Sequence, residues 1–550
     1  MTRNSTDDGT DHGTDDGTAA YDVVVVGGGP AGLSGALALV RSRRSVLVVD
    51  AGEPRNAPAA GVHNLLGRDG VPPAELLAAG RAEVVGYGGE VVEGRVEAAL
   101  RDGDGFVVSL AGGTRVRARR LLVATGLVDD LPAVPGLAAR WGRDVLHCPY
   151  CHGWEARDRR VGVLATGPLA VHQAQLWRQL TPHVLLLTHT NGAPDEETAE
   201  ALAARQVLPV DGEVVEVLTT DDALTGVRLA SGEVVELDVL AVAPLFTARA
   251  DVLAGLGAAT EPLEVLGHVV ATQVPAGPDG ATAVPGVWVA GNVTGAMAQV
   301  VSSAAAGLMA GASINADLVA EDVRLAVAAY RHAAATMFEA PAWEERYGTS
   351  RAIWSGRPNT WLVAEAADLA PGRALDVGCG EGADAVWLAG RGWQVTGVDI
   401  SATALERAAG HAAAAGPDVA ARTTWVRADL RTDPQAAGGG YDLVSAQFMH
   451  LPGDVRRALY ARLADAVAPG GTLLVVGHHP RDLRTSAHRM HFPAMMFTAE
   501  EVAADLDPQV WDVVAAQTRE RAALGHEGEA ATVHDAVLVA RRRPARPLAG

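Results

Sequence analysis

Residues 21–50, YDVVVVGGGPAGLSGALALVRSRRSVLVVD, decide the fold of the first half of the chain. A run of valines, a glycine turn, a helix-type run of small residues and a second apolar run predict a β-strand, an α-helix and a parallel β-strand. Gly27, Gly29 and Gly32 lie at the strand-to-helix turn, where glycine permits close backbone approach and the helix N-terminus offers N–H groups to a pyrophosphate. Asp50 ends the second strand, where a carboxylate can accept hydrogen bonds from a ribose. The stretch predicts a dinucleotide-binding unit, and the alternative is a glycine turn that only packs the helix on the sheet.

The same strand–helix–strand pattern occurs twice more. It is found in RRVGVLATGPLAVHQAQLWRQLTPHVLLLTHT, residues 159–190, and in GRALDVGCGEGADAVWLAGRGWQVTGVDIS, residues 372–401. Each copy begins with an apolar strand, turns at glycine and returns to an apolar strand. The sequence therefore predicts an α/β protein with three Rossmann-like units in its 550 residues.

Composition excludes several functions. Lys plus Arg is 45 and Asp plus Glu is 66, which gives a net charge of −21 that repels phosphate backbones and anionic membranes. We expect no nucleic-acid partner and no membrane association. All of the cations are Arg, which excludes a Walker A loop and lysine catalysis. Residues 1–20 are polar and repetitive and are expected to form a disordered acidic tail.

Three cysteines, Cys148, Cys151 and Cys379, are too few for a disulfide scaffold and indicate a reducing, cytoplasmic location. Cys148 and Cys151 form a CxxC pair, which suits disulfide exchange because one thiol attacks while the other resolves. His152 follows directly and titrates near neutrality, so it can manage the proton of the leaving thiolate. A c-type haem attachment, a zinc site with His147 and His152, and a pair of buried structural thiols are the alternatives.

The first half, about residues 21–320, resembles the low-molecular-weight thioredoxin reductases. The resemblance is carried by GGGPAG, Asp50, the ATG at 124–126, the CxxC pair and the AGNV segment followed by Gln299. It implies an FAD domain that is split by an inserted pyridine-nucleotide domain. It also implies that Cys151 lies nearer the flavin, that Cys148 meets the substrate and that His152 donates the proton. The implied cofactor-binding residues are Gly27, Gly29, Pro30, Ala31, Gly32, Asp50, Thr125, Gly126, Gly291, Asn292, Gln299 and Val300.

Two departures from this family concern the cofactors. The second glycine loop reads Ala165–Ala170, ATGPLA, and the following strand ends in THTNG at 188–192, where the reductases carry arginines for a 2′-phosphate. NADPH use is therefore an open question. A branch of the family, the dithiol oxidases of microbial disulfide metabolites, keeps FAD and CxxC and passes electrons to oxygen, and CPYCHGWE resembles that branch. Gly291-Asn292 also replaces the usual Gly-Asp.

The second half contains DVGCGEG at 376–382 and later acids at strand ends. This set resembles class I S-adenosylmethionine-dependent methyltransferases, and a dehydrogenase-type NAD domain is the alternative. The resemblance implies S-adenosylmethionine as methyl donor. The residues expected to bind it are Asp376, Gly378, Gly380, Asp399 and Asp429.

The segment that opens the second half resembles methyltransferases of the tellurite-resistance and thiopurine kind, which act on soft nucleophiles. Trp343, Tyr347, Trp354 and Arg357 form either a lid over the donor or hydrophobic anchors for the first helix of the domain. Cys379 is expected to be a packing residue, and His450 is a candidate general base for methyl transfer.

The expected function is a bifunctional enzyme, an FAD-dependent thiol/disulfide oxidoreductase fused to a methyltransferase. The expected partners are a small dithiol or disulfide or a thioredoxin-like protein, a small methyl acceptor, and, from the reductase resemblance, a second copy in a homodimer. The alternatives are an NADPH-dependent thioredoxin reductase with an appended methyltransferase, and one half acting as a non-catalytic ligand sensor. The expected domains are an acidic tail (1–20), a first FAD-binding segment (21–117), an inserted NAD(P)-type domain with the CxxC (118–244), a second FAD-binding segment (245–320), a linker helix (321–342) and a methyltransferase domain (343–542).

Overall fold

The computed structural model describes residues 18–449, 451–484, 492–524 and 530–544. Most of the predicted acidic tail, up to residue 17, and the candidate base at 450 lie outside these ranges. The chain divides into two compact units, and the boundary between them in the sequence lies between Val323 and Arg324. Within the described ranges, no helix is both long and apolar enough to cross a membrane.

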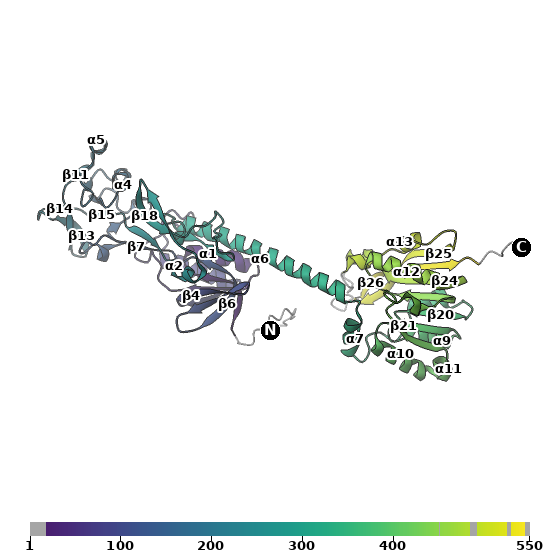
Figure 1. Ribbon diagram of the computed structural model, residues 1–550. Helices are drawn as coiled ribbons and strands as arrows, with labels where there is room; N and C mark the ends of the chain where they lie inside the picture. The colour runs from purple at the N-terminus through teal and green to yellow at the C-terminus, as the bar shows by residue number, and fades with distance from the viewer. Residues whose placement is uncertain (1–17, 450, 485–491, 525–529, 545–550) are drawn as a thin grey trace. The chain divides into compact units, whose positions relative to one another are not determined.

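The valine run forms β1 within the first sheet, of which β4 and β6 are labelled in Figure 1, and the predicted strand–helix–strand unit is confirmed. Val23, Val24 and Val25 are fully buried, as expected for a strand covered on both faces. β1 pairs in parallel with β2, with Val23 opposite Val46. The sheet has the order β3-β2-β1-β6-β5-β4, and β19 pairs with the end of β6. Its strands are β1 (Ala20–Val26), β2 (Val46–Asp50), β3 (Glu90–Glu93), β4 (Val96–Asp102), β5 (Gly105–Leu110), β6 (Arg115–Val123) and β19 (Val287–Val289).

Glycines let α1 pack closely on the turn after β1, and let α6 pack closely on α1. A Cβ on Gly32 of α1 would clash with the carbonyl oxygen of Gly27, and one on Gly307 of α6 would clash with that of Ala31. The N-terminal half of α1 is therefore held directly between β1 and α6, which fixes the position of the glycine turn. The helices of the first unit are α1 (Pro30–Arg41), α2 (Pro73–Gly86), α3 (Pro149–His152), α4 (Ala170–Trp177), α5 (Glu196–Ala204) and α6 (Val300–Thr336), the last of which continues past Val323.

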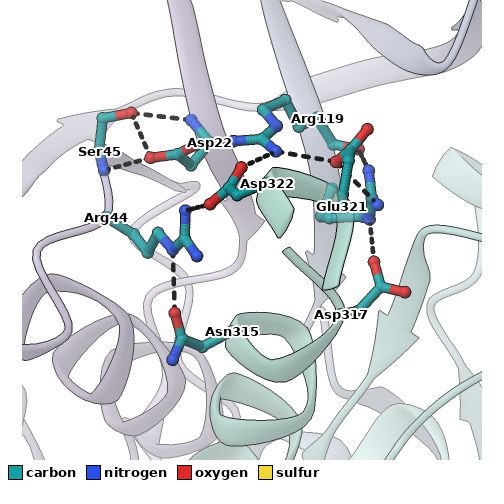
Figure 2. Close-up of polar contacts among 9 residues, drawn as sticks. Asp22, Arg44, Ser45, Arg119, Asn315, Asp317, Glu321 and Asp322 are labelled. Carbon is teal, nitrogen blue, oxygen red and sulfur yellow. Dashed lines mark hydrogen bonds and ion pairs between the residues drawn. The ribbon is translucent and has the colours of Figure 1, made fainter. Parts of the chain in front are cut away.

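A network of charged groups holds α6 on the sheet (Figure 2). Arg119 of β6 donates to Asp22 at 2.8 Å, to Glu321 at 2.9 Å and to Asp322 at 2.6 Å. Arg44 also bonds Asp322, at 2.7 Å. Single exposed ion pairs contribute only about 0–1 kcal/mol, but groups shared between several pairs are already ordered and add more. The network anchors the part of α6 around residues 315–322. Its other members are Ser45, Arg120, Asn315 and Asp317.

The residues between the two segments of the first sheet form a second parallel sheet. Strands β7 (Leu127–Asp130) and β16 (Leu245–Ala248) pair antiparallel, so the chain leaves and re-enters the first region side by side. The boundaries predicted at 117 and 244 fall within β6 and directly before β16. The second sheet has the order β11-β10-β9-β15-β8, and its strands are β8 (Val145–Leu146), β9 (Val161–Leu164), β10 (Val184–Leu187), β11 (Leu208–Val210) and β15 (Val239–Val242). Two small sheets contain β12 (Val214–Thr220), β13 (Ala223–Leu229) and β14 (Val234–Glu236), and β17 (Glu261–Val265) and β18 (His268–Gln273) with β16 and β7.

The second unit is built on one seven-stranded sheet of order β22-β21-β20-β23-β24-β26-β25. The first five strands are parallel, and β26 and β25 are antiparallel. The strands are β20 (Arg373–Val377), β21 (Gln394–Asp399), β22 (Thr423–Arg427), β23 (Tyr441–Gln447), β24 (Val467–His478), β25 (Trp511–Leu524) and β26 (Ala530–Arg542). The helices are α7 (Ala340–Gly348), α8 (Thr360–Ala366), α9 (Ala383–Gly390), α10 (Ala402–Ala415), α11 (Pro417–Ala420), α12 (Gly453–Ala466) and α13 (Ala499–Ala504). The three predicted Rossmann-like sheets are thus confirmed.

Candidate functional site

The first unit contains a cavity of about 1060 Å³ that joins the glycine turn after β1 to the CxxC pair. Of the site residues predicted for the first half, Gly32 alone does not line it, because it packs beneath Gly27. The predicted residues that line this cavity are Gly27, Gly29, Pro30, Ala31, Asp50, Thr125, Gly126, Cys148, Cys151, His152, Gly291, Asn292, Gln299 and Val300.

The glycine turn has the shape of a cradle for a ligand. Gly27 has a φ of +111°, and a Cβ on Gly28 would lie 2.5 Å from the carboxylate of Asp50. Gly291 has a φ of +77°, and a Cβ there would lie 2.8 Å from Ala31. Only glycine allows the two loops to meet in this way at the N-terminus of α1. That N-terminus has N–H groups that the helix itself does not use.

Arginines organise the polar side of this cavity, and no local sequence pattern indicates them. Arg81 of α2 forms an ion pair with Asp50. Arg55 binds both carboxylate oxygens of Asp129, at 2.8 and 2.6 Å, and its guanidinium lies 3.4 Å from the side-chain oxygen of Asn292. Asn292 uses its amide to donate to nearby backbone carbonyls. The residue that replaces the usual aspartate is therefore part of the loop structure after β19.

Cys148 and Cys151 form a disulfide, and their Cα atoms lie 5.2 Å apart. Cys148 is the N-cap of α3, because its sulfur accepts a hydrogen bond from the Cys151 amide at 3.1 Å. The amide nitrogen of Gln299, directly before α6, lies 4.0 Å from the Cys148 sulfur. A disulfide that faces a cofactor-type cradle favours the redox interpretation of this pair over the zinc, haem and buried-thiol alternatives.

His152 is partly buried beside the disulfide. Both of its ring nitrogens are buried and have no hydrogen-bond partner among the described residues. Burial lowers the pKa of His152 and outweighs the nearby Glu155, which raises it, while His63 lowers it further. The imidazole is therefore neutral at pH 7, with a nitrogen available to accept a proton.

Residues 188–192 follow β10, at the position where the resemblance to the reductases implies a site for a 2′-phosphate. Two of their side chains accept hydrogen bonds from the backbone instead. Thr188 is buried, and its hydroxyl accepts from the Gly212 amide at 3.3 Å. The ring of His189 accepts from the Val214 amide at 3.0 Å. The side chains of Thr188 and His189 are thus committed to backbone groups, and residues 188–192 contain no arginine.

The second unit contains a cavity of about 800 Å³ at the carboxyl ends of its parallel strands. Gly378, Gly380, Asp399 and Asp429 line it, whereas Asp376 lies behind the glycine loop. Gly378 and Gly380 have φ values of +65° and +53°. These left-handed conformations open the loop and expose its backbone to the cavity.

Carboxylates surround this loop at different depths. Asp399 accepts hydrogen bonds from the amides of Gly380 and Ser401, both at 2.9 Å, and burial raises its pKa. Asp376 is buried, and one of its oxygens has no partner among the described residues. Burial raises its pKa well above the usual value, and Asp384 adds to the effect. Burial also raises the pKa of Asp384 itself to about 6.

The aromatic segment before β20 covers the glycine loop, as a lid would, and its most buried member is also an anchor. Tyr347 is only 2% exposed, whereas Trp354 is 46% exposed and donates to the Tyr347 hydroxyl at 2.9 Å. A Cβ on Gly380 would lie 3.1 Å from each of them. Trp343 and Arg357 line the same cavity. The sequence left two alternatives for this segment, a lid and a hydrophobic anchor. In the structure Trp354 takes the position of the lid, and the buried Tyr347 takes that of the anchor.

Glu381 holds this segment in place, a role that its position in the loop did not reveal. Its carboxylate accepts from the amides of Ile353 and Trp354, at 3.4 and 3.2 Å, and binds Arg407 at 2.8 Å. Cys379 is buried, and burial raises its pKa well above the usual value. Its thiol stays protonated, which agrees with a packing role. Asp429 is paired with Arg431.

Comparison with known proteins follows the division into two units. The pattern of the pyridine nucleotide-disulphide oxidoreductases matches residues 21–308, more than half of the chain. The chain belongs to this oxidoreductase family. The pattern of a methyltransferase domain matches residues 374–471, so this oxidoreductase also carries a methyltransferase domain.

Individual relatives of this oxidoreductase match its first unit. The thioredoxin reductase tcpT of Claviceps purpurea is 34% identical over 313 residues, which is 54% of this chain and 95% of the relative. The crystal structure of HlmI is 44% identical, covers 59% of this chain and 99% of its own, and has a TM-score of 0.53. An oxidoreductase from Agrobacterium tumefaciens is 34% identical, covers 55% of this chain and 99% of its own, and has a TM-score of 0.51.

Proposed function

We propose that the chain is a bifunctional enzyme that oxidises a small dithiol through the Cys148–Cys151 pair with FAD, and transfers a methyl group from S-adenosylmethionine to a soft nucleophile. The observation that carries the first activity is the position of the disulfide. It lies in the same cavity as the cradle formed by the turn after β1 and the loop after β19. A redox pair that lines the same cavity as a flavin site needs no further electron carrier between the two.

The cradle fits FAD. The N-terminus of α1 and the glycine turn would hold the pyrophosphate, since a Cβ at Gly28 would fill the space beside Asp50 and one at Gly27 would meet the carbonyl of Ala124. Asp50, which forms an ion pair with Arg81, would accept from the ribose hydroxyls. The loop at Gly291 and Asn292 would cover the flavin end. When bound, the flavin takes the electron pair from the reduced cysteines and transfers it to an acceptor.

Dithiol oxidation requires two exchanges of sulfur. One thiolate of the substrate attacks Cys148, the Cys148–Cys151 bond breaks, and Cys151 leaves as a thiolate. The second substrate thiol, once deprotonated, attacks the substrate sulfur that is bound to Cys148. This step forms the substrate disulfide and releases the Cys148 thiolate. Two electrons are then held on the pair, and the two substrate protons have been given up, one to His152 and the other to solvent.

The pH dependence of this reaction tests His152. The pKa of His152 lies below the usual value, so the ring is neutral at pH 7. It becomes protonated, and can no longer accept a proton, as pH falls through the lowered pKa. We expect the turnover number to hold at neutral pH and to fall only at a pH below the ordinary histidine pKa. His152→Gln should lower it by about 100-fold at pH 7 and remove the acid limb of the profile. An acid limb that persists in His152→Gln would show that another group takes the proton.

The same cysteine pair could work in the opposite direction, as in an NADPH-dependent thioredoxin reductase. Thr188 and His189 are bonded to backbone groups where that activity needs cations for a 2′-phosphate. Oxidation of a dithiol, with oxygen as the electron acceptor, is therefore the better supported direction.

Anaerobic titration of the FAD-loaded full chain distinguishes the two directions. We expect a dithiol such as dithiothreitol to bleach the flavin absorption rapidly, and NADPH to bleach it at least about 10-fold more slowly, because no arginine is present in the 188–192 loop to bind the 2′-phosphate. Readmission of oxygen should restore the absorption. Rapid bleaching by NADPH would instead establish the reductase alternative.

The second cavity fits S-adenosylmethionine. The open backbone at Gly378 and Gly380 leaves room for the methionine part, and the unpartnered oxygen of Asp376 lies behind the same loop. Asp399 and Asp429 would accept from the ribose and the adenine edge. When bound, the cofactor supplies an electrophilic methyl group. Tyr347 and Trp354 would cover it and exclude water.

A dithiol is the methyl acceptor that would let both units act on the same substrate, because oxidation and S-methylation are competing reactions of the same sulfur atoms. The soft-nucleophile resemblance of the segment at 343–359 supports a thiol acceptor. Incubation with S-adenosylmethionine and a panel of thiols, selenols and amines should yield methyl thioethers or selenoethers. Methylation of none of the soft acceptors would overturn the thiol assignment and favour a non-catalytic ligand-binding role for the second unit.

A further inference from the structure

The cavity of the second unit extends beyond the loops expected to hold the methyl donor. Gly378 and Asp399 lie at the ends of β20 and β21, whereas Arg521 lies near the end of β25 and lines the same cavity. Four steps between neighbouring strands, each about 4.8 Å, separate β20 from β25, or about 19 Å along the sheet. Because β26 is antiparallel to both β24 and β25, β25 ends at the same edge of the sheet as the parallel strands. Arg521 therefore lies far along the cavity from the expected ribose site at Asp399.

The guanidinium of Arg521 is held from one side. Its Nε donates to the carboxylate of Asp535 at 2.7 Å, and the indole N–H of Trp361 donates to the same oxygen at 3.0 Å. Asp535 is fully buried, so it fixes the position of the guanidinium. The Arg521 side chain is 37% exposed, and its two terminal nitrogens form no hydrogen bond with any of the described residues. An arginine that is oriented by a buried carboxylate and keeps its terminal donors is preorganised to bind an anion.

An aromatic wall lies beside this guanidinium. Phe448, which follows β23, has a φ of +53°, a strained conformation for an aromatic residue and one that is common at ligand sites. The centre of its ring lies 5.8 Å from the guanidinium carbon of Arg521 and 4.8 Å from the centre of the His478 ring. All three residues line the cavity. A molecule with an apolar body and an anionic group would find both a surface and a cation here.

Charge is divided between the two ends of the cavity. The acidic residues that line it lie in the glycine loop, on α9 and at the ends of β21 and β22, and are Glu381, Asp384, Asp399 and Asp429. Among the described lining residues on β23, β24 and β25, Arg521 is charged and none is acidic. The positive sulfonium of S-adenosylmethionine suits the acidic end. The end at Arg521 suits an anion.

We propose that Arg521 binds a carboxylate of the methyl acceptor, so that the second unit methylates thiols that also carry a carboxylate. The planar fork of the guanidinium matches the two oxygens of a carboxylate. With the carboxylate held there, the thiolate of the acceptor attacks the methyl carbon of the donor. The new carbon–sulfur bond forms as the bond from that carbon to the sulfonium breaks, and the thiol proton has gone to solvent. The inference rests on the proposed S-methylation and adds the chemical class of the acceptor.

The test compares 4-mercaptobenzoate with 4-mercaptobenzamide, two thiols of the same shape that differ in charge, on the full chain with S-adenosylmethionine. The kcat and KM for formation of the methyl thioether are measured for each thiol, and the affinity for S-adenosylmethionine is measured by calorimetry. The variants are Arg521→Gln and Arg521→Lys, the second of which keeps a cation beside the buried Asp535 if the first does not fold. The control is Arg519→Gln, because Arg519 lies on the same strand and also binds a carboxylate, that of Glu365 at 2.6 Å, but does not line the cavity.

We expect the unaltered chain to prefer 4-mercaptobenzoate about 30-fold in kcat/KM, and Arg521→Gln to lose this preference through a higher KM for that thiol. Arg521→Lys should keep a preference of about 5-fold, because an ammonium cannot bind both oxygens in the same way, and Arg519→Gln should keep all of it.

Three results would each overturn the carboxylate site. They are equal kcat/KM values for the two thiols in the unaltered chain, a preference that is unchanged in the Arg521 variants, and an equal loss for both thiols in those variants. Weaker binding of S-adenosylmethionine in the Arg521 variants would also overturn it, because Arg521 would then bind the donor. Methylation of neither thiol by the unaltered chain would overturn the proposed S-methylation itself, and the carboxylate site with it.

Discussion

Cys151→Ser is expected to lower dithiol-dependent turnover by at least about 1000-fold while the flavin stays bound. The substitution removes the disulfide, so no sulfur–sulfur bond is left for a substrate thiolate to attack. Cys148→Ser should cause a loss of the same size for the same reason. The two losses should not add in the double variant, because the cysteines act as one unit.

Flavin content separates this loss from a loss of folding. The cradle is formed by the turn after β1, by Asp50 and by the loop after β19, none of which belongs to α3. The variants should therefore bind FAD with the same stoichiometry as the unaltered chain, as measured by its absorption after gel filtration. Turnover of a dithiol at more than about one-tenth of the normal rate in Cys151→Ser would contradict the role of the pair.

The regions of the molecule that could be predicted from the sequence are those whose residues are contiguous. The valine run of β1 and the glycine turn that follows identify a buried parallel strand and a helix N-terminus within one short stretch. Asp50 could be placed at the cavity because it ends the next strand. In each case the local pattern is the cause of the local structure.

The contacts that could not be predicted depend on residues distant in sequence. Arg81 reaches Asp50 from α2, and Arg55 binds Asp129 across 74 positions of the chain. No local sequence pattern identifies the ion-pair partner of an arginine in a loop or on a helix face, because most arginines at such positions are exposed to solvent. The order of the strands in space is what brings these pairs together.

Glu381 shows both cases in one residue. Its place in the glycine loop of the second unit was visible, but what it does there is set by Arg407 on α10 and by the backbone at Ile353 and Trp354. The carboxylate connects the loop, the helix and the aromatic segment that covers the cavity. The lid and the cofactor loop of the second unit are therefore coupled through one buried ion pair.

Asp399→Asn is the change expected to affect the second unit most, with a loss of affinity for S-adenosylmethionine of about 100-fold. One oxygen of Asp399 accepts from the Gly380 amide and the other from the Ser401 amide. An asparagine would have to turn an N–H₂ group toward one of these N–H donors. The glycine loop would lose a hydrogen bond, and the cofactor ribose would lose the charge of its partner.

The dependence of this affinity on pH distinguishes a ribose ligand from a purely structural residue. Burial raises the pKa of Asp399, so as pH falls its carboxylate is protonated at a higher pH than that of an ordinary aspartate. Calorimetric titration should show affinity for S-adenosylmethionine falling on the acid side in the unaltered chain and a flatter profile in Asp399→Asn. Asp442→Asn is the control, since Asp442 accepts from the Arg373 amide at 2.8 Å at the opposite end of the sheet and does not line the cavity. Equal affinities in Asp399→Asn and Asp442→Asn would show that the carboxylate at the end of β21 does not bind the methyl donor.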